Sequence, residues 1–320
     1  MSSRTNLLLR IAVSLLVIVA LFHFIDFSLV FDRLRQLSPL FLVAIFALVL
    51  AQNVLFAVRW SAIADFCDAR VGALLAIRFT IISMFFNQTL PGTLGGDSIR
   101  VLLSVGEGVS VKRAFLSVVI DRILALGVLI GLVAASLPIL AVSIAEPRLI
   151  YGMAFLAAIL VSGIVAFLML PLLIPHRWRL WRLVRVLIEL AGTTSSLLGN
   201  RKLVVTTVPL AIAGHLLSGG VAVLCAKAMH IAVDPVLTVI LLLPALLAMA
   251  IPVSIAGWGV REGAMVVALG QIGVHPADAL ALSVAFGFIF MLAGIPGGLL
   301  WLVPRPGRVP IAHAKNKEIA

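Results

Sequence analysis

Six long apolar runs dominate the pattern of hydrophobic and polar positions along this chain. A helix that crosses a bilayer needs about 20 consecutive, mostly apolar residues. The runs of about that length are Leu7–Ile25, Leu40–Val58, Ala114–Leu140, Leu149–Ile174, Leu203–Ala226 and Ala277–Val303. Each is predicted to be a membrane-spanning helix. No small-residue cleavage site follows the first run, so we interpret it as an uncleaved helix and not as a signal peptide.

Two further apolar stretches are broken by proline and glycine. Val71–Leu90 is followed by a Pro/Gly-rich segment and then by the short run Ile99–Val105. Pro235–Ile251 is followed in the same way by the short run Ala264–Leu269. Neither short run can span a bilayer alone, and a helix broken at membrane depth is tolerated only inside protein or beside a water-filled cavity. Each stretch is therefore a candidate helical hairpin.

The composition is that of a membrane protein. Hydrophobic residues make up 62% of the 320 residues and charged residues 12%, against roughly 45–50% and about 25% in soluble domains. These proportions exclude a secreted enzyme, a disulfide scaffold, a disordered chain and a nucleic-acid-binding domain. Cys67 and Cys225 are predicted to be unpaired thiols, because one lies in a polar loop and the other in an apolar run.

The basic residues distinguish two topologies. If each broken stretch crossed the membrane once, the strongly basic loop His176–Lys202 would lie outside, against the positive-inside tendency. If each stretch is instead a re-entrant hairpin, that loop and both termini lie in the cytoplasm. The cytoplasmic set then contains Arg4, Arg10, Arg59, Arg70, Lys112, Arg113, the basic residues of the loop, Arg305, Arg308, Lys315 and Lys317. Only Arg33, Arg35, Arg148 and Lys227 remain outside.

An internal repeat supports the same architecture. Asp97 and Glu262 are 165 positions apart (262 − 97), and Gly108 and Gly273 have the same spacing. Each half then holds three crossings and one hairpin, and an odd number of crossings inverts the second copy. We predict an all-α polytopic membrane protein with six crossings and two re-entrant helical hairpins arranged as an inverted repeat. A single integral membrane domain covers residues 1–320, with half one at about 1–148, half two at about 149–305 and a basic cytoplasmic tail at 306–320.

Both hairpins carry acidic and basic residues close to their glycines. The first holds Asn87, Asp97 and Arg100, and the second holds Arg261 and Glu262. An acid in the first turn of a short helix is a favourable cap, and the free N–H groups at such a helix start suit a phosphate. Two interpretations stay open: the acids are structural caps paired with the neighbouring arginines, or they belong to a functional site.

The run Ala114–Leu140 contains a charged pair, Asp121-Arg122, well inside it. Neighbours on a helix point about 100° apart, so each residue should meet a different partner. Arg122 is a candidate ligand for a lipid phosphate, because a guanidinium binds phosphate in a bidentate manner. The alternative is an internal ion pair between Arg122 and a hairpin acid.

Arginines alternate with Trp and Leu along Arg177–Glu189. That pattern predicts an amphipathic helix lying in the membrane interface. It would either attract anionic headgroups or serve only as a topology anchor.

A set of paired motifs carries a family resemblance. It comprises Asn87, Leu90-Pro91-Gly92, Gly95-Gly96-Asp97, Arg100, Asp121-Arg122, Pro252-Val253-Ser254 and Gly257-Trp258-Gly259-Val260-Arg261-Glu262-Gly263. This set resembles the lysylphosphatidylglycerol synthase transmembrane family, the flippase-like membrane region of multiple peptide resistance factors, which also occurs as stand-alone bacterial and archaeal membrane proteins. The resemblance implies lipid translocation between leaflets. No aminoacyl-transferase domain follows Val303, so lipid aminoacylation is not expected.

The leading hypothesis is a flippase or transporter that moves a polar lipid, either a phospholipid or a polyprenyl-linked lipid, between the leaflets of the inner (plasma) membrane. The expected substrate-binding residues are Asn87, Asp97, Arg100, Asp121, Arg122, Arg261 and Glu262. One alternative is an accessory membrane subunit of a lipid or glycan-lipid biosynthetic enzyme. A second is a membrane transferase acting on a lipid carrier, which the lack of a catalytic acid motif on an extracytoplasmic loop disfavours.

The motifs of metalloproteases, serine hydrolases and P-loop enzymes are missing from the sequence. We therefore expect no enzyme activity, no catalytic residue, no cofactor and no metal. The expected partners are membrane lipids with anionic headgroups, together with a homo-oligomer or a biosynthetic enzyme, and not nucleic acid.

Overall fold

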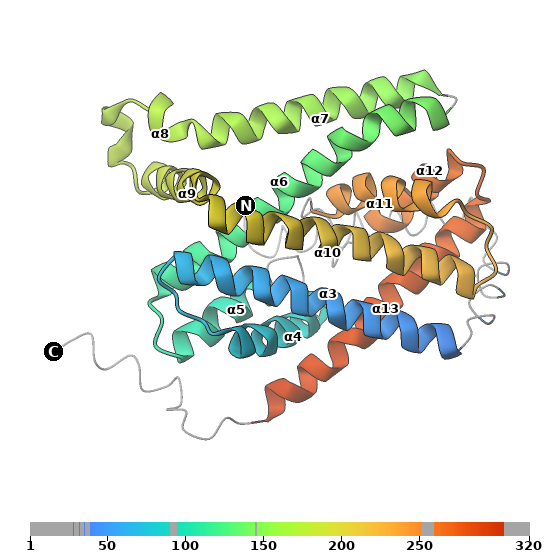
Figure 1. Cartoon of the computed structure of the whole chain (residues 1–320), viewed down its shortest axis with the longest axis horizontal. Coiled ribbons are helices and arrows are strands. Elements are labelled where there is room, and N and C mark those ends of the chain that lie inside the picture. The colour runs from blue at the N-terminus through green and yellow to red at the C-terminus, as the bar shows by residue number, and fades with distance from the viewer. Residues whose placement is uncertain are drawn as a thin grey trace, which may run out of the picture.

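The predicted all-helical fold is confirmed for the residues that the computed structural model describes, which are 28, 32, 35, 39–89, 95–144, 146–250 and 259–303. The helices are α3 (Pro39–Phe66), α4 (Ala73–Thr89), α5 (Gly95–Gly106), α6 (Val111–Ser143), α7 (Pro147–Leu168), α8 (Leu170–Leu173), the 3₁₀ helix η1 (His176–Leu180), α9 (Arg182–Gly199), α10 (Arg201–Ala228), α11 (Pro235–Ala250), α12 (Val260–Gly270) and α13 (Pro276–Leu302). Figure 1 shows their arrangement.

Five helices of the described part are long and apolar enough to cross a membrane: α3, α6, α7 from Ile150, α10 and α13. They correspond to five of the six predicted crossings. The sixth, Leu7–Ile25, lies outside the described residues, as do the hairpin tips at 90–94 and 251–258 and the tail from 304 onward. The shorter apolar helices α4 and α11 correspond to the first arms of the two predicted hairpins.

The sequence placed two boundaries wrongly. The run Leu149–Ile174 was expected to be one helix, but α7 ends at Leu168 and α8 follows. Pro171 in the first turn of α8 has no N–H with which to continue α7. The expected helix Arg177–Glu189 is also divided, because Trp181 is extended between η1 and α9. The guanidinium of Arg179 donates to the carbonyl oxygens of Pro171 and Ile174, which holds η1 against α8.

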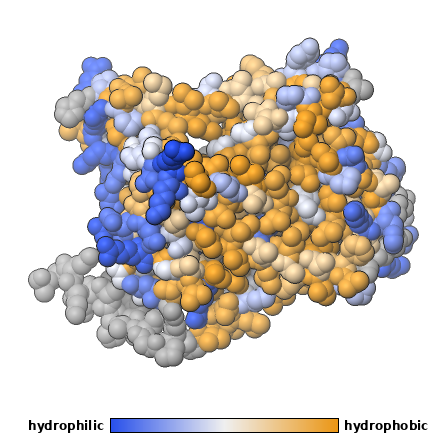
Figure 2. All heavy atoms as spheres, in the orientation of Figure 1, coloured by the Kyte–Doolittle hydropathy of each residue, from blue (hydrophilic) through white to orange (hydrophobic). Residues whose placement is uncertain are grey.

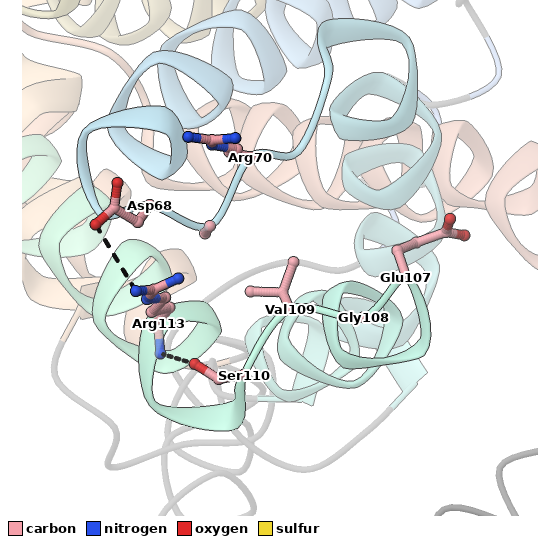
Figure 3. Close-up of a pocket in the computed structure, with 8 residues that line it drawn as sticks. Asp68, Arg70, Glu107, Gly108, Val109, Ser110 and Arg113 are labelled. Carbon is pink, nitrogen blue, oxygen red and sulfur yellow. Dashed lines mark hydrogen bonds and ion pairs between the residues drawn. The ribbon is translucent and has the colours of Figure 1, made fainter.

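The two ends of the predicted first hairpin, after α3 and before α6, lie close together. Asp68, just after α3, lies 4.0 Å from Arg113 in the first turn of α6. The turn after α3 and the turn between α5 and α6 enclose a polar surface pocket of about 490 Å³ (Figure 3). It is lined by Asp68, Ala69, Arg70, Glu107, Gly108, Val109, Ser110 and Arg113. Between these turns α4 and α5 pack against each other. The chain therefore leaves α3 and enters α6 at one end of the bundle.

Local features recur at nearly the spacing that the sequence predicted. Asp68 and His230 both have a left-handed backbone, with φ of 54° and 53°, at a spacing of 162 (230 − 68). Gly108 and Gly273 have φ of 89° and 80° at a spacing of 165 (273 − 108). The helix contacts recur as well: α4 packs on α13, and α11 packs on α6. The spacing rises from 162 to 165 because 25 positions separate the starts of α11 and α12 (260 − 235), whereas 22 separate the starts of α4 and α5 (95 − 73).

The central crossing joins corresponding positions of α3 and α10. These two helices are both 28 residues long and pack along each other. The amide of Gln52 donates to the carbonyl oxygen of Gly214 (2.8 Å), 162 positions later (214 − 52). Figure 1 shows the two helices running in opposite directions. A two-fold axis that passes between two antiparallel helices brings their corresponding positions into contact, and the contact between Gln52 and Gly214 is of that kind. The inverted repeat, the orientation of the halves in the bilayer, the six crossings and the domain boundaries stay predictions.

The surface has a hydrophobic middle and hydrophilic ends. In Figure 2 apolar residues cover most of the centre of the visible face, and polar residues gather at its left and right edges. The left edge includes the region where η1 and α9 lie in Figure 1. This distribution is typical of a helical membrane protein whose long helices run from one interface to the other.

Glycine is required where α13 touches α4. A methyl group on Gly297 would overlap the backbone carbonyl oxygen of Ile81. We expect Gly297→Ala to lower the stability of the purified protein by about 1–3 kcal/mol, the usual cost of overpacking. Gly131→Ala in α6 is the control, because a Cβ there has nothing within 4 Å. Thermal unfolding in detergent measures both variants, and an unchanged midpoint for Gly297→Ala would contradict the tight α4–α13 contact.

Two exposed positions test the orientation. Leu180, in the predicted cytoplasmic segment, is 79% exposed, and Arg148, in the predicted outside loop, is also exposed. In a background without Cys67 and Cys225, a membrane-impermeant thiol reagent added outside should label Arg148→Cys and spare Leu180→Cys. The reverse pattern would reject the orientation. In the wild-type protein Cys67 itself would react slowly near neutral pH, because burial and the charge of Asp68 raise its pKa to about 11 and the thiolate is the reactive form.

Candidate functional site

The candidate site lies deep within the bundle of long helices. Asp121 and Arg122 are ten and eleven residues into α6, which places them roughly 15 Å along its axis at about 1.5 Å per residue. His215, on α10, is close to the middle of that 28-residue helix. Charged groups at this depth must be paired or hydrated, because an unpaired charge costs about 2.5–3.5 kcal/mol on insertion scales.

Five charged side chains from three helices form one connected cluster. Asp97, at the start of α5, accepts from Arg100 (2.6 Å) and from both Nε (2.7 Å) and Nη2 (2.8 Å) of Arg122. Asp121 accepts from Nε of Arg59 on α3 (2.8 Å) and from Arg100 (3.3 Å). Asp121 and Arg122 therefore meet different partners, as the helical geometry predicted. Arg100 bridges the two carboxylates.

The cluster has one more positive charge than negative. Its three arginines and two aspartates sum to +1 (3 − 2). Arg59 and Arg100 are each 3% exposed. Nη1 of Arg59, Nε of Arg100 and Oγ1 of Thr80 are buried and have no hydrogen-bond partner in the part of the chain that the structure describes. Buried donors without partners are costly, so these groups call for water or a ligand.

A cavity of about 210 Å³ lies next to the cluster. Its lining combines charged and polar groups from α3, α4, α5, α6 and α10 with apolar ones, namely Asn53, Phe56, Arg59, Thr80, Ser83, Met84, Asn87, Gln88, Arg100, Asp121, Arg122, Ala125, His215 and Phe290. Arg122 has 51% of its side chain exposed, whereas the Asp97 carboxylate that it grips has 8%. Arg122 thus lines this cavity with about half of its side chain exposed. The cavity can hold an anion against a guanidinium.

Neighbouring residues fix the cluster in place. The side-chain oxygen of Asn87 accepts from the backbone N–H of Gly96 (3.0 Å), which joins the end of α4 to the start of α5. Gly96 has no side chain because a Cβ there would overlap the carbonyl oxygen of Ser83. The Arg100 guanidinium lies over the ring of Trp60 on α3. Its carbon is 5.0 Å from the ring centroid, which is a cation–π distance. The hairpin arms thus hold Asp97 and Arg100 rigidly.

Arg59 belongs to the site, although the sequence placed it among the cytoplasmic charges. The apolar run ends at Val58, so Arg59 reads as a basic flank of a crossing. The structure continues α3 to Phe66 and buries Arg59 against Asp121. The signal that could have identified it is the apolar side chains beyond it, since Trp60, Ile63 and Ala64 are fully buried.

The predicted residues Arg261 and Glu262 form a separate pair in the second half. Arg261 donates to Glu262 from Nε (3.0 Å) and Nη2, and to the hydroxyl of Ser283 on α13 (3.3 Å). Glu262 also accepts from the backbone N–H of Gly259 and so caps α12. Both side chains are almost fully buried. The structure therefore brings Asn87, Asp97, Arg100, Asp121 and Arg122 together, and places Arg261 and Glu262 elsewhere.

The two hairpins hold their acid in comparable ways. Gly287 on α13 occupies the position that corresponds to Arg122 on α6 (287 − 165 = 122). The guanidinium of Arg261 lies where a Cβ of Gly287 would be. In each half, then, a guanidinium at the same level of the crossing helix neutralises a hairpin carboxylate. In the first half it also faces a cavity.

Both interpretations of these charges have support in the first hairpin. Asp97 is paired with Arg100 and Arg122, as the structural interpretation required. Arg122 nevertheless keeps an accessible face, as the phosphate-binding interpretation required. Among the described residues there is no group of three or more His, Cys, Asp or Glu side chains that could hold a metal ion.

Comparison with known proteins places this chain in a family. The family described as the lysylphosphatidylglycerol synthase TM region matches residues 7–297. A UPF0104 membrane protein of Archaeoglobus fulgidus is 26% identical over 117 residues, which cover 37% of this chain and 36% of that relative. The match thus spans little more than a third of the relative's length. No solved structure matches this chain. Since the family match covers most of the sequence, this multi-pass membrane protein belongs to the lysylphosphatidylglycerol synthase transmembrane region family.

Proposed function

We propose that this protein moves a lipid with an anionic headgroup between the leaflets of the plasma membrane. The observation that carries the proposal is the buried cluster of three arginines and two aspartates beside a polar cavity. The family and the apolar helices support a role at membrane lipids. The proposal assigns no chemical conversion to the site.

The charge of the cluster selects the kind of headgroup. Two carboxylates neutralise two arginines, and the remaining positive charge favours a phosphate headgroup with a net negative charge over a zwitterionic or cationic headgroup. Arg122 offers its free face, and Arg59 and Arg100 offer their unpartnered N–H groups. Because Arg59 and Arg100 are buried, contacts to them are stronger than they would be in water.

The carboxylates keep the empty site stable. Without Asp97 and Asp121, three guanidinium groups would repel one another in a medium of low dielectric constant. With them, the site stays folded while no lipid is bound. We propose that the headgroup phosphate replaces water at the outer face of Arg122 and leaves the Asp97 pair intact.

Substitution of Arg122 separates a structural role from a transport role. Arg122→Gln leaves Asp97 paired with Arg100, so the variant should fold and unfold at a temperature close to that of the wild type. Lipid transport in reconstituted vesicles should fall by roughly tenfold to a hundredfold, because a hydrogen bond to a charged group contributes about 1.5–3 kcal/mol. Lys112→Gln, which removes a surface cation from the same helix, is the control and should transport normally.

The double variant completes this test. If Arg122 served only to neutralise Asp97, then Arg122→Gln with Asp97→Asn should restore both stability and transport. We expect stability without transport. Wild-type flux from a stable Arg122→Gln protein would remove Arg122 from the mechanism. Absence of flux from the folded wild-type protein, for every anionic lipid tried, would favour the accessory-subunit alternative.

The second charged pair is proposed to be structural. A methyl group on Gly287 would displace the Arg261 guanidinium from its place beside Glu262. Separating one partner of a buried ion pair costs about 3–5 kcal/mol, so Gly287→Ala should lower the unfolding temperature in detergent markedly. Gly163→Ala, where a Cβ meets nothing within 4 Å, should not. Equal midpoints for the two variants would show that the Arg261–Glu262 pair can rearrange freely.

A further inference from the structure

A second cavity, entirely apolar, lies between α6, α7 and α11. Its volume is about 280 Å³, and its lining includes Leu126 on α6, Ala157 on α7 and Ala248 on α11. Every described residue of that lining is aliphatic, methionine or proline. Both α6 and α7 qualify as membrane-spanning helices. The cavity is therefore lined for hydrocarbon, and not for a headgroup or water.

This apolar cavity adjoins the polar one along a single helix. Ala125 lines the polar cavity and Leu126, the next residue of α6, lines the apolar cavity. Arg122, which presents its free face to the polar cavity, precedes Leu126 by four residues. Residues four apart lie on the same face of a helix, roughly 6 Å apart along its axis. A charged group held at Arg122 and a chain held at Leu126 can thus belong to one amphipathic molecule.

The apolar cavity is open at its rim. Of the residues that line it, Leu126 is 39% exposed and Leu156 is 52% exposed, whereas Ala157 on α7 is only 4% exposed. In Figure 1 α7 lies at the outer edge of the molecule beside α6, where a bilayer surrounds a crossing helix. The molecules available at that rim are the acyl chains of the bilayer. Hydrocarbon gains little by leaving other hydrocarbon, so this cavity would orient a chain more than it would attract one.

We infer that the cavity between α6, α7 and α11 holds one acyl chain of a bilayer phospholipid whose phosphate lies at Arg122. The inference rests on the proposed function for the identity of the headgroup site. It adds that the lipid enters sideways, between α6 and α7, and that one of its chains remains in an apolar seat.

Photo-cross-linking tests this seat directly. The probe is phosphatidylglycerol with a diazirine in the middle of one acyl chain, incorporated with the full-length protein into nanodiscs. Peptide mapping should find the label concentrated on the cavity-lining segments of α6, α7 and α11. Ala157→Phe, which fills the cavity, should lose that label. The adjacent, exposed Ala158→Phe is the matched control and should keep it.

A second variant guards against misfolding. Ala248→Phe fills the same cavity from α11 and should also lose the label, and thermal unfolding identifies any variant that does not fold. Label spread evenly over exposed helix faces, or unchanged when the cavity is filled, would overturn the inference. Weak labelling of the wild-type cavity would also overturn it.

The cross-linking result does not depend on whether the protein transports lipid in vesicles. If the cavity is labelled and vesicles show no lipid flux, the acyl-chain seat stands and the proposed function fails. If vesicles show flux that Arg122→Gln abolishes, and the cavity is not labelled, only the seat is wrong.

Discussion

Neutralising charge in an apolar environment is the constraint on which the rest of this structure depends. A guanidinium or carboxylate inside a membrane protein is tolerated only with a partner, and its desolvation is repaid only by close, well-directed hydrogen bonds. Asp97 and Asp121 supply those bonds to three arginines from α3, α5 and α6. The cluster therefore fixes the first hairpin against two crossing helices, and the helix ends, the glycines and Trp60 are arranged around it.

The same constraint produces two different results in the two halves. In the second half, Arg261 reaches from the hairpin over Gly287 to Glu262, and one cation meets one anion. In the first half Asp97 meets two cations, Arg100 from α5 and Arg122 from the crossing helix, and a third arginine, Arg59, joins from α3 through Asp121. In the part of the chain that the structure describes, the charges of Arg261 and Glu262 cancel, whereas the first cluster keeps a positive charge and lies beside a cavity.

Much of the fold could be predicted from the sequence, because crossing helices are long and their apolar composition is unmistakable. The broken stretches and the spacing of Asp97 and Glu262 also indicated two hairpins and their acids. Arg59 was missed because a run of apolar residues ends at Val58, and the burial of a residue beyond that point depends on packing with Asp121, 62 positions away. The break at Trp181 was missed for a similar reason, since Arg179 bonds to carbonyl groups of the preceding helix. The joining of Arg122 to Asp97 and the separation of Arg261 from them likewise depend on tertiary contacts.

The central claim is that the cluster's extra positive charge makes it an anion site, and equilibrium binding of short-chain lipids tests it most directly. Purified protein in detergent would be titrated with dihexanoyl phosphatidylglycerol and with dihexanoyl phosphatidylcholine, which differ in headgroup charge. The account predicts tighter binding of phosphatidylglycerol by the wild type. It also predicts loss of that preference in Arg59→Gln, whose cluster is neutral and whose Asp121 still pairs with Arg100. Equal affinity of the wild type for both lipids, or an unchanged preference in a folded Arg59→Gln protein, would contradict it.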